Sequence, residues 1–177
     1  GNPPEGKIAL LEDTDGDDQY DKRTVFADGL TFPNGVMPWK GGVYVTCAPN
    51  VYYFKDTNGD GVADVKQIVF AGFQDLSTTQ LRVSHPTLNI DNWVYLTSGL
   101  TAAKVTSPEH PERPVVALNR VDGRFRPGTD EIEATAGTAQ FGQTFDNFGR
   151  KFICSNRNHI QHVVMQLDYL KRNPNLA

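Results

Sequence analysis

DTNGDGVAD, at residues Asp56–Asp64, and DTDGDDQYD, at residues Asp13–Asp21, share one alternating acidic pattern. Calcium favours this spacing, because oxygens at loop positions 1, 3, 5 and 9 and a main-chain carbonyl at position 7 can surround one hard cation. The sequence therefore predicts two calcium loops. The expected ligands are Asp13, Asp15, Asp17, Gln19 and Asp21 in the first loop and Asp56, Asn58, Asp60, Val62 and Asp64 in the second.

The residues alone leave a second interpretation of these loops open. Asp and Gly are also frequent in solvated turns. Three or four carboxylates in one short loop nevertheless repel one another unless a divalent cation lies between them. Position 12, which carries a bidentate Glu in an EF-hand, is Thr24 or Gln67 here, so neither loop is a full EF-hand. Such loops suit calcium affinities on the order of 10⁻⁴–10⁻³ M, which favours an extracytoplasmic protein, periplasmic or secreted.

Short β-branched and aromatic runs flank both loops. KIALLE and RTVFA surround the first loop, and VYYFK and VKQIVF surround the second. Each loop is therefore predicted to join two strands. Asp18 stands where the second loop has Gly61. Because Asp tolerates a positive φ better than most residues, we expect weaker binding in the first loop rather than none.

The similarity extends beyond the loops, since residues 8–30 and 51–73 align at a spacing of 43 residues without a gap across the loop. Repeats of roughly 40–50 residues made of short strands are typical of propeller blades. We therefore expect a single all-β domain over residues 1–177, a partial β-propeller of about three blades. The blade-like repeats are expected at about 7–49, 50–99 and 115–167.

Closed propellers usually have 4–8 blades, so about three blades leave sheet edges open. We expect the remainder of a longer parent chain, or another propeller segment, to cover them. The proline-bearing segment TAAKVTSPEHPERP at 101–114 is predicted to be a surface loop, and helical periodicity occurs only near 168–173.

Composition excludes some functions. A chain of 177 residues with 38% hydrophobic residues and a net charge of -4 is a globular domain without a basic surface for nucleic acid. No apolar run approaches the ~18–20 residues of a membrane span, so no transmembrane segment is expected. The opening GNPPEG lacks the features of a signal peptide, which leaves export open.

Several longer motifs resemble a known family over nearly the whole chain. They are LLEDTDGD, FPNGVMPWKGGVYVT, KDTNGDGVADV, DNWVYLTSGL, FGQTFDNFGRKFICSNRNHIQHVV and the closing RNP. They resemble the N-terminal domain of the planctomycete-type membrane-bound dehydrogenases, exported proteins often fused to cytochrome c modules. The resemblance implies a β-propeller related to the glucose/sorbosone dehydrogenases, of which this chain is the first part. It also implies oxidation of a sugar or an alcohol, with electron transfer to a cytochrome.

The resemblance further implies pyrroloquinoline quinone as a cofactor and indicates two segments. QLRVSHP supplies Arg82 and His85 as candidate catalytic residues, with the imidazole as general base. SNRNHIQH supplies Arg157 and Asn158, which resemble the Arg-Asn element that contacts the quinone in that family. The glycine that follows this element in the family is absent here. A structural role for His85, His159 and His162 remains an alternative.

Other functions stay open as well. The chain can be a non-catalytic propeller that binds glycans or a protein partner, with Trp39 as a possible aromatic platform, or an architectural module. His159 and His162 are three residues apart and admit either a transition-metal site or a structural role. Cys47 and Cys154 end corresponding strands and are either bridged or two free thiols.

Overall fold

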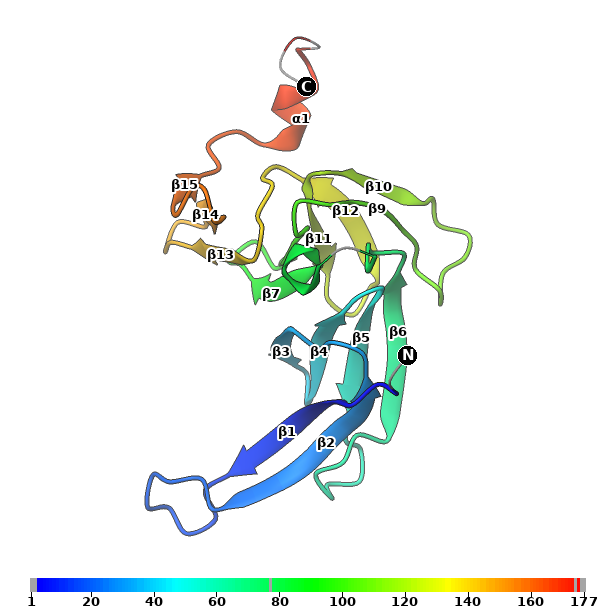
Figure 1. The fold of residues 1–177 in the computed structure, drawn as a ribbon, viewed down its shortest axis with the longest axis vertical. Coiled ribbons are helices and arrows are strands. Elements are labelled where there is room, and N and C mark those ends of the chain that lie inside the picture. Colours follow the sequence, from blue (N-terminus) through cyan, green and yellow to red (C-terminus); the bar gives the residue numbers. More distant parts are fainter. Residues whose placement is uncertain (1–2, 77, 174, 176–177) are drawn as a thin grey trace.

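The computed structural model describes residues 3–76, 78–173 and 175, and its regular secondary structure is almost entirely antiparallel β-sheet (Figure 1). The helices within these described ranges are two single turns, η1 (Thr79–Leu81) and α1 (Leu167–Leu170). The predicted all-β class is confirmed, and the short helix falls where the sequence predicted one. No helix among the described residues has the length and apolar composition needed to cross a membrane.

The chain begins with a two-stranded hairpin, β1 (Gly6–Glu12) and β2 (Lys22–Leu30), joined by the first acidic loop. Burial alternates residue by residue along β1, with Ile8 and Leu10 on the more buried face and Leu11 on the exposed face. This is the period-2 pattern of a strand with one face on a core.

A four-stranded meander follows, formed by β3 (Gly35–Trp39), β4 (Gly42–Cys47), β5 (Asn50–Lys55) and β6 (Val65–Ala71). The second acidic loop joins β5 to β6, so both acidic loops connect paired strands, as predicted. Strand β4 is buried almost throughout, because it lies inside the sheet and both faces of the sheet are covered.

The next sheet also has four strands, β7 (Ser84–Leu88), β8 (Val94–Thr97), β11 (Asp122–Arg126) and β12 (Glu131–Thr135). A separate hairpin of β9 (Ala102–Val105) and β10 (Val116–Asn119) is inserted between β8 and β11. The prediction of a loop over 101–114 is therefore wrong at 102–105. Polar and apolar residues alternate only weakly in that segment, and its strand conformation depends on pairing with β10.

The last sheet is smaller and consists of β13 (Gly142–Phe145), β14 (Lys151–Cys154) and β15 (Gln161–His162). Its third strand is only two residues long, and α1 follows it at the end of the fold (Figure 1).

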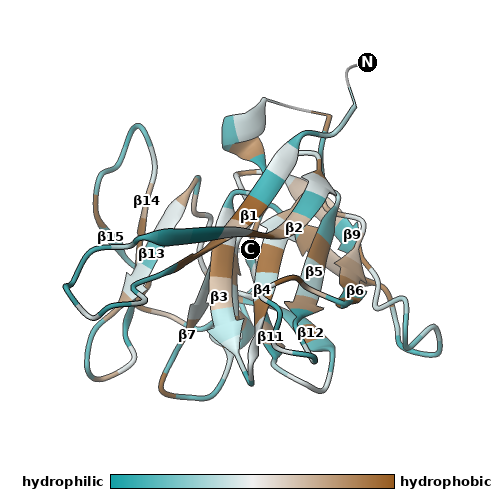
Figure 2. Ribbon diagram, turned by 90° about the horizontal axis from the view of Figure 1, so that it is seen from below, coloured by the Kyte–Doolittle hydropathy of each residue, from teal (hydrophilic) through white to brown (hydrophobic). Residues whose placement is uncertain are grey.

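Two apolar clusters hold the sheets together. One lies between the β1–β2 hairpin and the β3–β6 sheet and contains Leu30, Val45 and Phe54. The other lies between the β3–β6 sheet and the sheet of β7, β8, β11 and β12, and it is centred on Phe70 and Phe125. In Figure 2 hydrophobic colour is concentrated on strands in the middle of this stack, while the outer loops are mainly hydrophilic. The β3–β6 sheet is thus packed on both faces.

The sheets do not share the boundaries of the sequence repeats. The limit expected between residues 49 and 50 separates β4 from β5, although these strands pair over six positions. The range 115–167 likewise joins β11 and β12 of one sheet to β13, β14 and β15 of the next. The unit that repeats in the sequence is a strand, an acidic loop and a strand, whereas hydrogen bonding between neighbouring strands defines a sheet.

Candidate metal-binding loops

The first residue of each acidic loop organises the main chain around it. The Asp13 carboxylate accepts hydrogen bonds from the Gly16 N–H at 2.7 Å and the Asp18 N–H at 3.0 Å. These main-chain donors, with Gly16 foremost, hold the pKa of Asp13 below its usual value. The carboxylate therefore stays ionised in weak acid.

The second loop repeats this arrangement. The Asp56 carboxylate accepts hydrogen bonds from the Gly59 N–H at 2.7 Å and the Gly61 N–H at 2.8 Å. The pKa of Asp56 is also lowered, with the Gly61 bond as the main cause. Equivalent atoms thus make equivalent bonds in the two loops.

The last residue of each loop closes it. Asp21 accepts from the Thr14 hydroxyl at 2.9 and 2.8 Å, and Asp64 accepts from the Thr57 hydroxyl at 2.6 Å. Each of these aspartates also donates its main-chain N–H across the base of its loop at 3.1 Å, Asp21 to the carbonyl of Glu12 and Asp64 to that of Lys55. Both loops are closed by one and the same scheme.

Backbone geometry explains why glycine occupies particular positions of the two loops. Gly16 and Gly59 have φ of 79° and 83°, and at position 6 Gly61 has φ of 85°. Asp18, which replaces the glycine at position 6 of the first loop, has φ of 66°. Aspartate therefore adopts the left-handed conformation there, as expected from its tolerance of this region.

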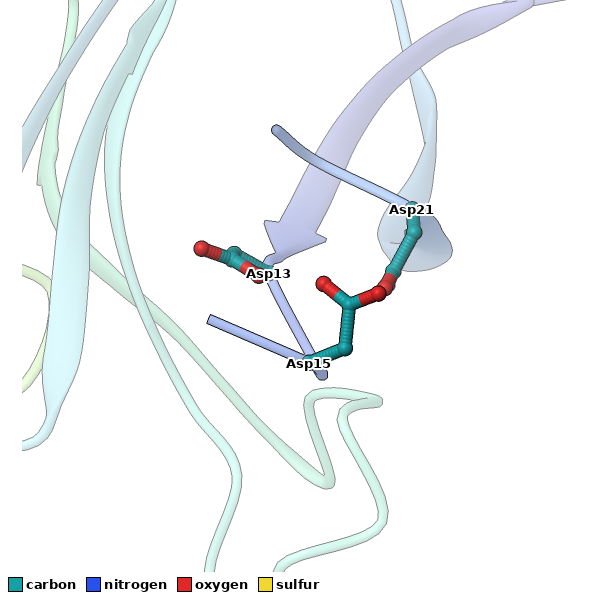
Figure 3. A group of neighbouring side chains, drawn as sticks. All are labelled: Asp13, Asp15 and Asp21. Carbon is teal, nitrogen blue, oxygen red and sulfur yellow. The ribbon is translucent and has the colours of Figure 1, made fainter. Parts of the chain in front are cut away.

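Three carboxylates of the first loop converge. Asp13, Asp15 and Asp21 each place one oxygen so that the three oxygens lie within 4.8 Å of one another (Figure 3). Hard oxygen donors at this spacing fit a divalent cation such as Ca²⁺. In the second loop Asn58 occupies position 3, where an amide oxygen is also an acceptable calcium donor.

The remaining predicted ligands take part in hydrogen bonds within their own loops. Asp17 accepts the N–H of Gln19 at 2.9 Å, and Asp60 accepts the N–H of Val62 at 2.8 Å. These short bonds shape the main chain at position 7, whose carbonyl was the predicted donor. In the second loop the Asn58 amide also donates to Asp60 at 3.2 Å.

The two loops differ in their surroundings. A Cβ on Gly61 would lie 3.3 Å from Cγ2 of Thr24 and 3.6 Å from Cδ2 of Leu10, so this loop lies against the first hairpin. The Ala63 N–H donates to the Phe26 carbonyl at 2.8 Å and ties the same loop to β2. Asp18, which stands in the first loop at the position of Gly61, is exposed. The first loop extends from the end of its hairpin (Figure 1).

Of the residues expected to form a quinone site, only His85 lines the pocket described next, and His159 in the same pocket was expected at a metal site or in a structural role. His85 and His159 line one pocket of about 360 Å³ with Phe152 and Ile160. His85 has φ of 55°, and its carbonyl accepts a hydrogen bond from the Gln143 amide at 2.9 Å. The pocket is predominantly apolar and histidine-lined.

The predicted cationic residues are not among those that line this pocket. Arg82 donates to the Asp75 carbonyl at 3.0 Å and stacks over Phe32. Arg157 and Asn158 lie in the exposed turn between β14 and β15, where the Asn158 carbonyl accepts from the Ser155 N–H at 2.8 Å. These residues and His85 therefore do not form one constellation.

The other candidates have structural surroundings. His162 stacks on Phe152, with ring centroids 4.8 Å apart. Both cysteines are free thiols, Cys47 buried and Cys154 half-buried. Trp39 is partly buried at the edge of the larger apolar cluster.

The structure also contains a buried ion pair that the sequence did not predict. Lys151 of β14 lies 2.7 Å from Asp122 of β11, and their side chains are 7% and 0% exposed. Asp122 also accepts the N–H groups of Ser98 and Ala139 at 3.0 and 3.1 Å. Burial lowers the pKa of Lys151 and Asp122 opposes that change. No local pattern marks the pair, because its members are 29 residues apart and Asp122-Gly123 resembles an ordinary turn.

Comparison with known proteins gives one finding. The family model described as a domain of unknown function, DUF7133, matches residues 1–177. Neither the comparison with curated proteins nor the comparison with solved structures gives a match. Because the family model spans the whole sequence, the chain belongs to the DUF7133 family.

Proposed function

We propose that this chain is a calcium-binding segment of a β-propeller, in which each acidic loop holds one calcium ion. The observation that supports this most directly is the hydrogen-bond scheme shared by the two loops, together with the three converging carboxylates of the first. Corresponding bonds recur at loop positions 1, 3, 5 and 9 of both loops, as expected of two loops that hold the same kind of cation.

Calcium suits these loops better than magnesium. Up to five oxygen donors from one short segment, including a main-chain carbonyl, match the flexible coordination of calcium, whereas magnesium usually retains several waters. An ion that binds only the folded loop stabilises the fold by mass action. It also relieves the repulsion among Asp13, Asp15 and Asp21, whose oxygens lie within 4.8 Å of one another.

The arrangement of the sheets supports a propeller. Two four-stranded antiparallel sheets pack face to face through a continuous apolar cluster, with a hairpin beyond one and a smaller sheet beyond the other. Face-to-face stacking of four-stranded sheets is how propeller blades meet. Calcium affinities in the range given above suit an extracytoplasmic parent protein.

A dehydrogenase activity of the parent protein, with a cytochrome as electron acceptor, rests on the family resemblance. The residues that the resemblance assigns to pyrroloquinoline quinone, which carries three carboxylates, do not meet in the pocket that contains His85. The pocket of His85 and His159 is mainly apolar, and Arg82 and Arg157 are not among its lining residues. The geometry therefore favours a scaffolding role for this segment, with catalytic groups supplied by other parts of the parent protein.

Calorimetric titration with Ca²⁺ tests the calcium proposal. We expect two weak sites in the wild type, one site in Asp17→Ala and one site in Asp60→Ala, with Mg²⁺ giving much weaker heats. Absence of heat up to tens of millimolar calcium would overturn the proposal. Titration with pyrroloquinoline quinone, followed by fluorescence quenching in the wild type and in Arg157→Ala, tests the cofactor separately. Tight uptake that Arg157→Ala abolishes would contradict the scaffolding role.

A further inference from the structure

A pocket of about 340 Å³ is formed jointly by the β3–β6 sheet and the turn that joins β11 to β12. Its aromatic lining comes from the sheet, with Trp39 on β3, Tyr44 on β4 and Tyr53 on β5. Gly128 and Asp130 of the turn complete the lining. The pocket therefore belongs to two sheets that pack on one another, and none of its lining residues lies in an acidic loop.

Contacts between strands hold the aromatic side chains of this pocket in place. Tyr44 is buried, its ring centre lies 5.0 Å from that of Tyr53, and its hydroxyl accepts the Gly128 N–H at 3.0 Å. The Tyr53 hydroxyl donates to the Trp39 carbonyl at 2.9 Å. A Cβ on Gly42 would lie 2.6 Å from Cζ of Tyr53, so glycine leaves the space that this ring occupies. A lining fixed in advance costs little ordering when a ligand binds.

Several polar groups of the lining still have hydrogen bonds to give. The indole N–H of Trp39 is buried and has no hydrogen-bond partner among the described residues, and a buried donor in that state is rare. Tyr44 accepts a bond from Gly128 and retains its own proton, since burial raises the pKa of Tyr44 to about 12. Gln67 and Asp130, joined at 3.4 Å, add an amide and a carboxylate. The pocket thus offers both donors and acceptors beside its aromatic rings.

Two lysines give the pocket an excess of positive charge. Lys40 and Lys55 both line it, and neither forms an ion pair among the described residues. The Lys40 ammonium lies 5.6 Å from the centre of the Trp39 ring. Aromatic pockets also bind methylated ammonium groups, but two lysines against the single carboxylate of Asp130 disfavour a cation here. The charge favours a ligand with an anionic group.

The backbone at Lys40 is a further sign that its side chain has a role. Lys40 and Gly41 form the two-residue turn between β3 and β4, with φ of 44° and 78°. Turns with two positive φ values favour Asn or Gly at the first position, because a larger side chain is strained there. Residues held in such conformations occur preferentially at functional sites.

We propose that this pocket binds a uronic-acid unit, a sugar ring that carries a carboxylate, with Trp39 against the apolar face of the ring and Lys40 and Lys55 beside the carboxylate. The ring hydroxyls exchange hydrogen bonds with Gln67 and Asp130.

The chemistry of such a sugar matches each part of the lining. A pyranose ring combines an apolar C–H face with hydroxyls around its edge, so it suits an aromatic surface bordered by donors and acceptors. A neutral sugar leaves the charge of the two lysines unmatched, and a small inorganic anion leaves the aromatic surface unused. Ligand pockets usually measure about 300–1,000 Å³, and a pocket of about 340 Å³ suits a small ligand.

An NMR titration of the ¹⁵N-labelled chain tests the proposal at the indole N–H of Trp39, a signal that Trp39→Phe identifies by its loss. The probes are disaccharides of glucuronate, galacturonate and mannuronate, each beside its neutral hexose counterpart. We expect a uronate to shift this signal with a dissociation constant on the order of 1 mM, as for other ligands of this size. Its neutral counterpart should bind about fivefold more weakly. If no uronate moves the signal up to about 20 mM, or if the neutral sugars bind as tightly, the proposal is overturned.

Two lysine variants separate binding from folding. Lys40→Asn and Lys55→Gln should each weaken uronate binding about fivefold. Lys40→Asn also places a residue suited to positive φ in the turn, so its melting temperature should stay equal or rise while its affinity falls.

Lys66→Gln is the matched control. Lys66 lies on the same sheet but stacks over Tyr52 and Phe54, at 5.4 and 5.8 Å, and is not among the lining residues, so its loss should leave the affinity unchanged. Wild-type affinity in both Lys40→Asn and Lys55→Gln would contradict the proposal. Because the pocket shares no residue with either acidic loop, this test and the calcium titration succeed or fail separately.

Discussion

The two acidic loops have the same internal bonds and different neighbours. Asp13 and Asp56 both accept the main-chain N–H groups of loop positions 4 and 6, and Thr14 and Thr57 close their loops alike. The loop at 13–21 extends from the tip of its hairpin (Figure 1), whereas the loop at 56–64 is bonded to β2 through the Ala63 N–H.

The two loops therefore share a local conformation but differ in how strongly they are connected to the rest of the fold. A cation in the loop at 13–21 would order a projecting tip. A cation in the loop at 56–64 would also strengthen the contact between the hairpin and the neighbouring sheet, because that loop lies against Thr24 and Leu10. We therefore expect equivalent changes to cost more stability in the second loop.

The largest effect is expected from Gly61→Ala. The new Cβ combines a φ of 85° with a 3.3 Å approach to Thr24, so the free energy of unfolding should fall by about 2–3 kcal/mol. Gly59→Ala and Gly16→Ala have similar φ values but open space, and each should cost only about 1 kcal/mol. Urea unfolding of the three variants measures the difference. Equal losses would show that packing on the hairpin contributes nothing.

Calcium should raise the melting temperature, and a chelator should lower it. At a calcium concentration tenfold above the dissociation constant, one site adds about 1.4 kcal/mol. Asp60→Ala should remove more of this response than Asp17→Ala, since its loop is coupled to the rest of the fold. Thermal melts with calcium or EDTA provide the measurement. A melt that a chelator leaves unchanged would contradict calcium binding.

Acid should weaken both loops through their first aspartates. The pKa of Asp13 and of Asp56 is lowered from 3.8 in the folded chain. A lowered pKa contributes stability that is present above the unfolded value and is lost as pH falls through the folded value. Between about pH 4 and pH 2 the wild type should therefore lose more stability than Asp13→Asn or Asp56→Asn. Urea midpoints across this range, in calcium-free buffer, test the sign.

The smallest effect is expected from Asp18→Gly, which gives the first loop the glycine of the second. Glycine adopts φ of 66° without steric cost but has more freedom when unfolded, so stability should change by less than about 1 kcal/mol. Calcium affinity of the first loop should rise toward that of the second. Calorimetry against the wild type decides this, and an unchanged affinity would assign the difference between the loops to their surroundings.

Local sequence determined the loops and the strands beside them. The spacing of Asp13, Asp15 and Asp21, the glycines at positive φ and the apolar runs on either side act within a few residues, so their conformation could be predicted. The all-β class followed from the same runs. Even the left-handed conformation of Asp18 was predictable, because it depends on the residue and its immediate turn.

Contacts between distant residues decided the rest. Pairing of β4 with β5 set the sheet boundaries, and the ion pair of Asp122 with Lys151 bridged two sheets, although no pattern along the chain marks either one. The packing of Gly61 against β2 belongs to the same class, and so does the fact that Arg82 and Arg157 do not line the histidine pocket. Such features depend on which surfaces exclude water together, and that is settled only when the whole chain is folded.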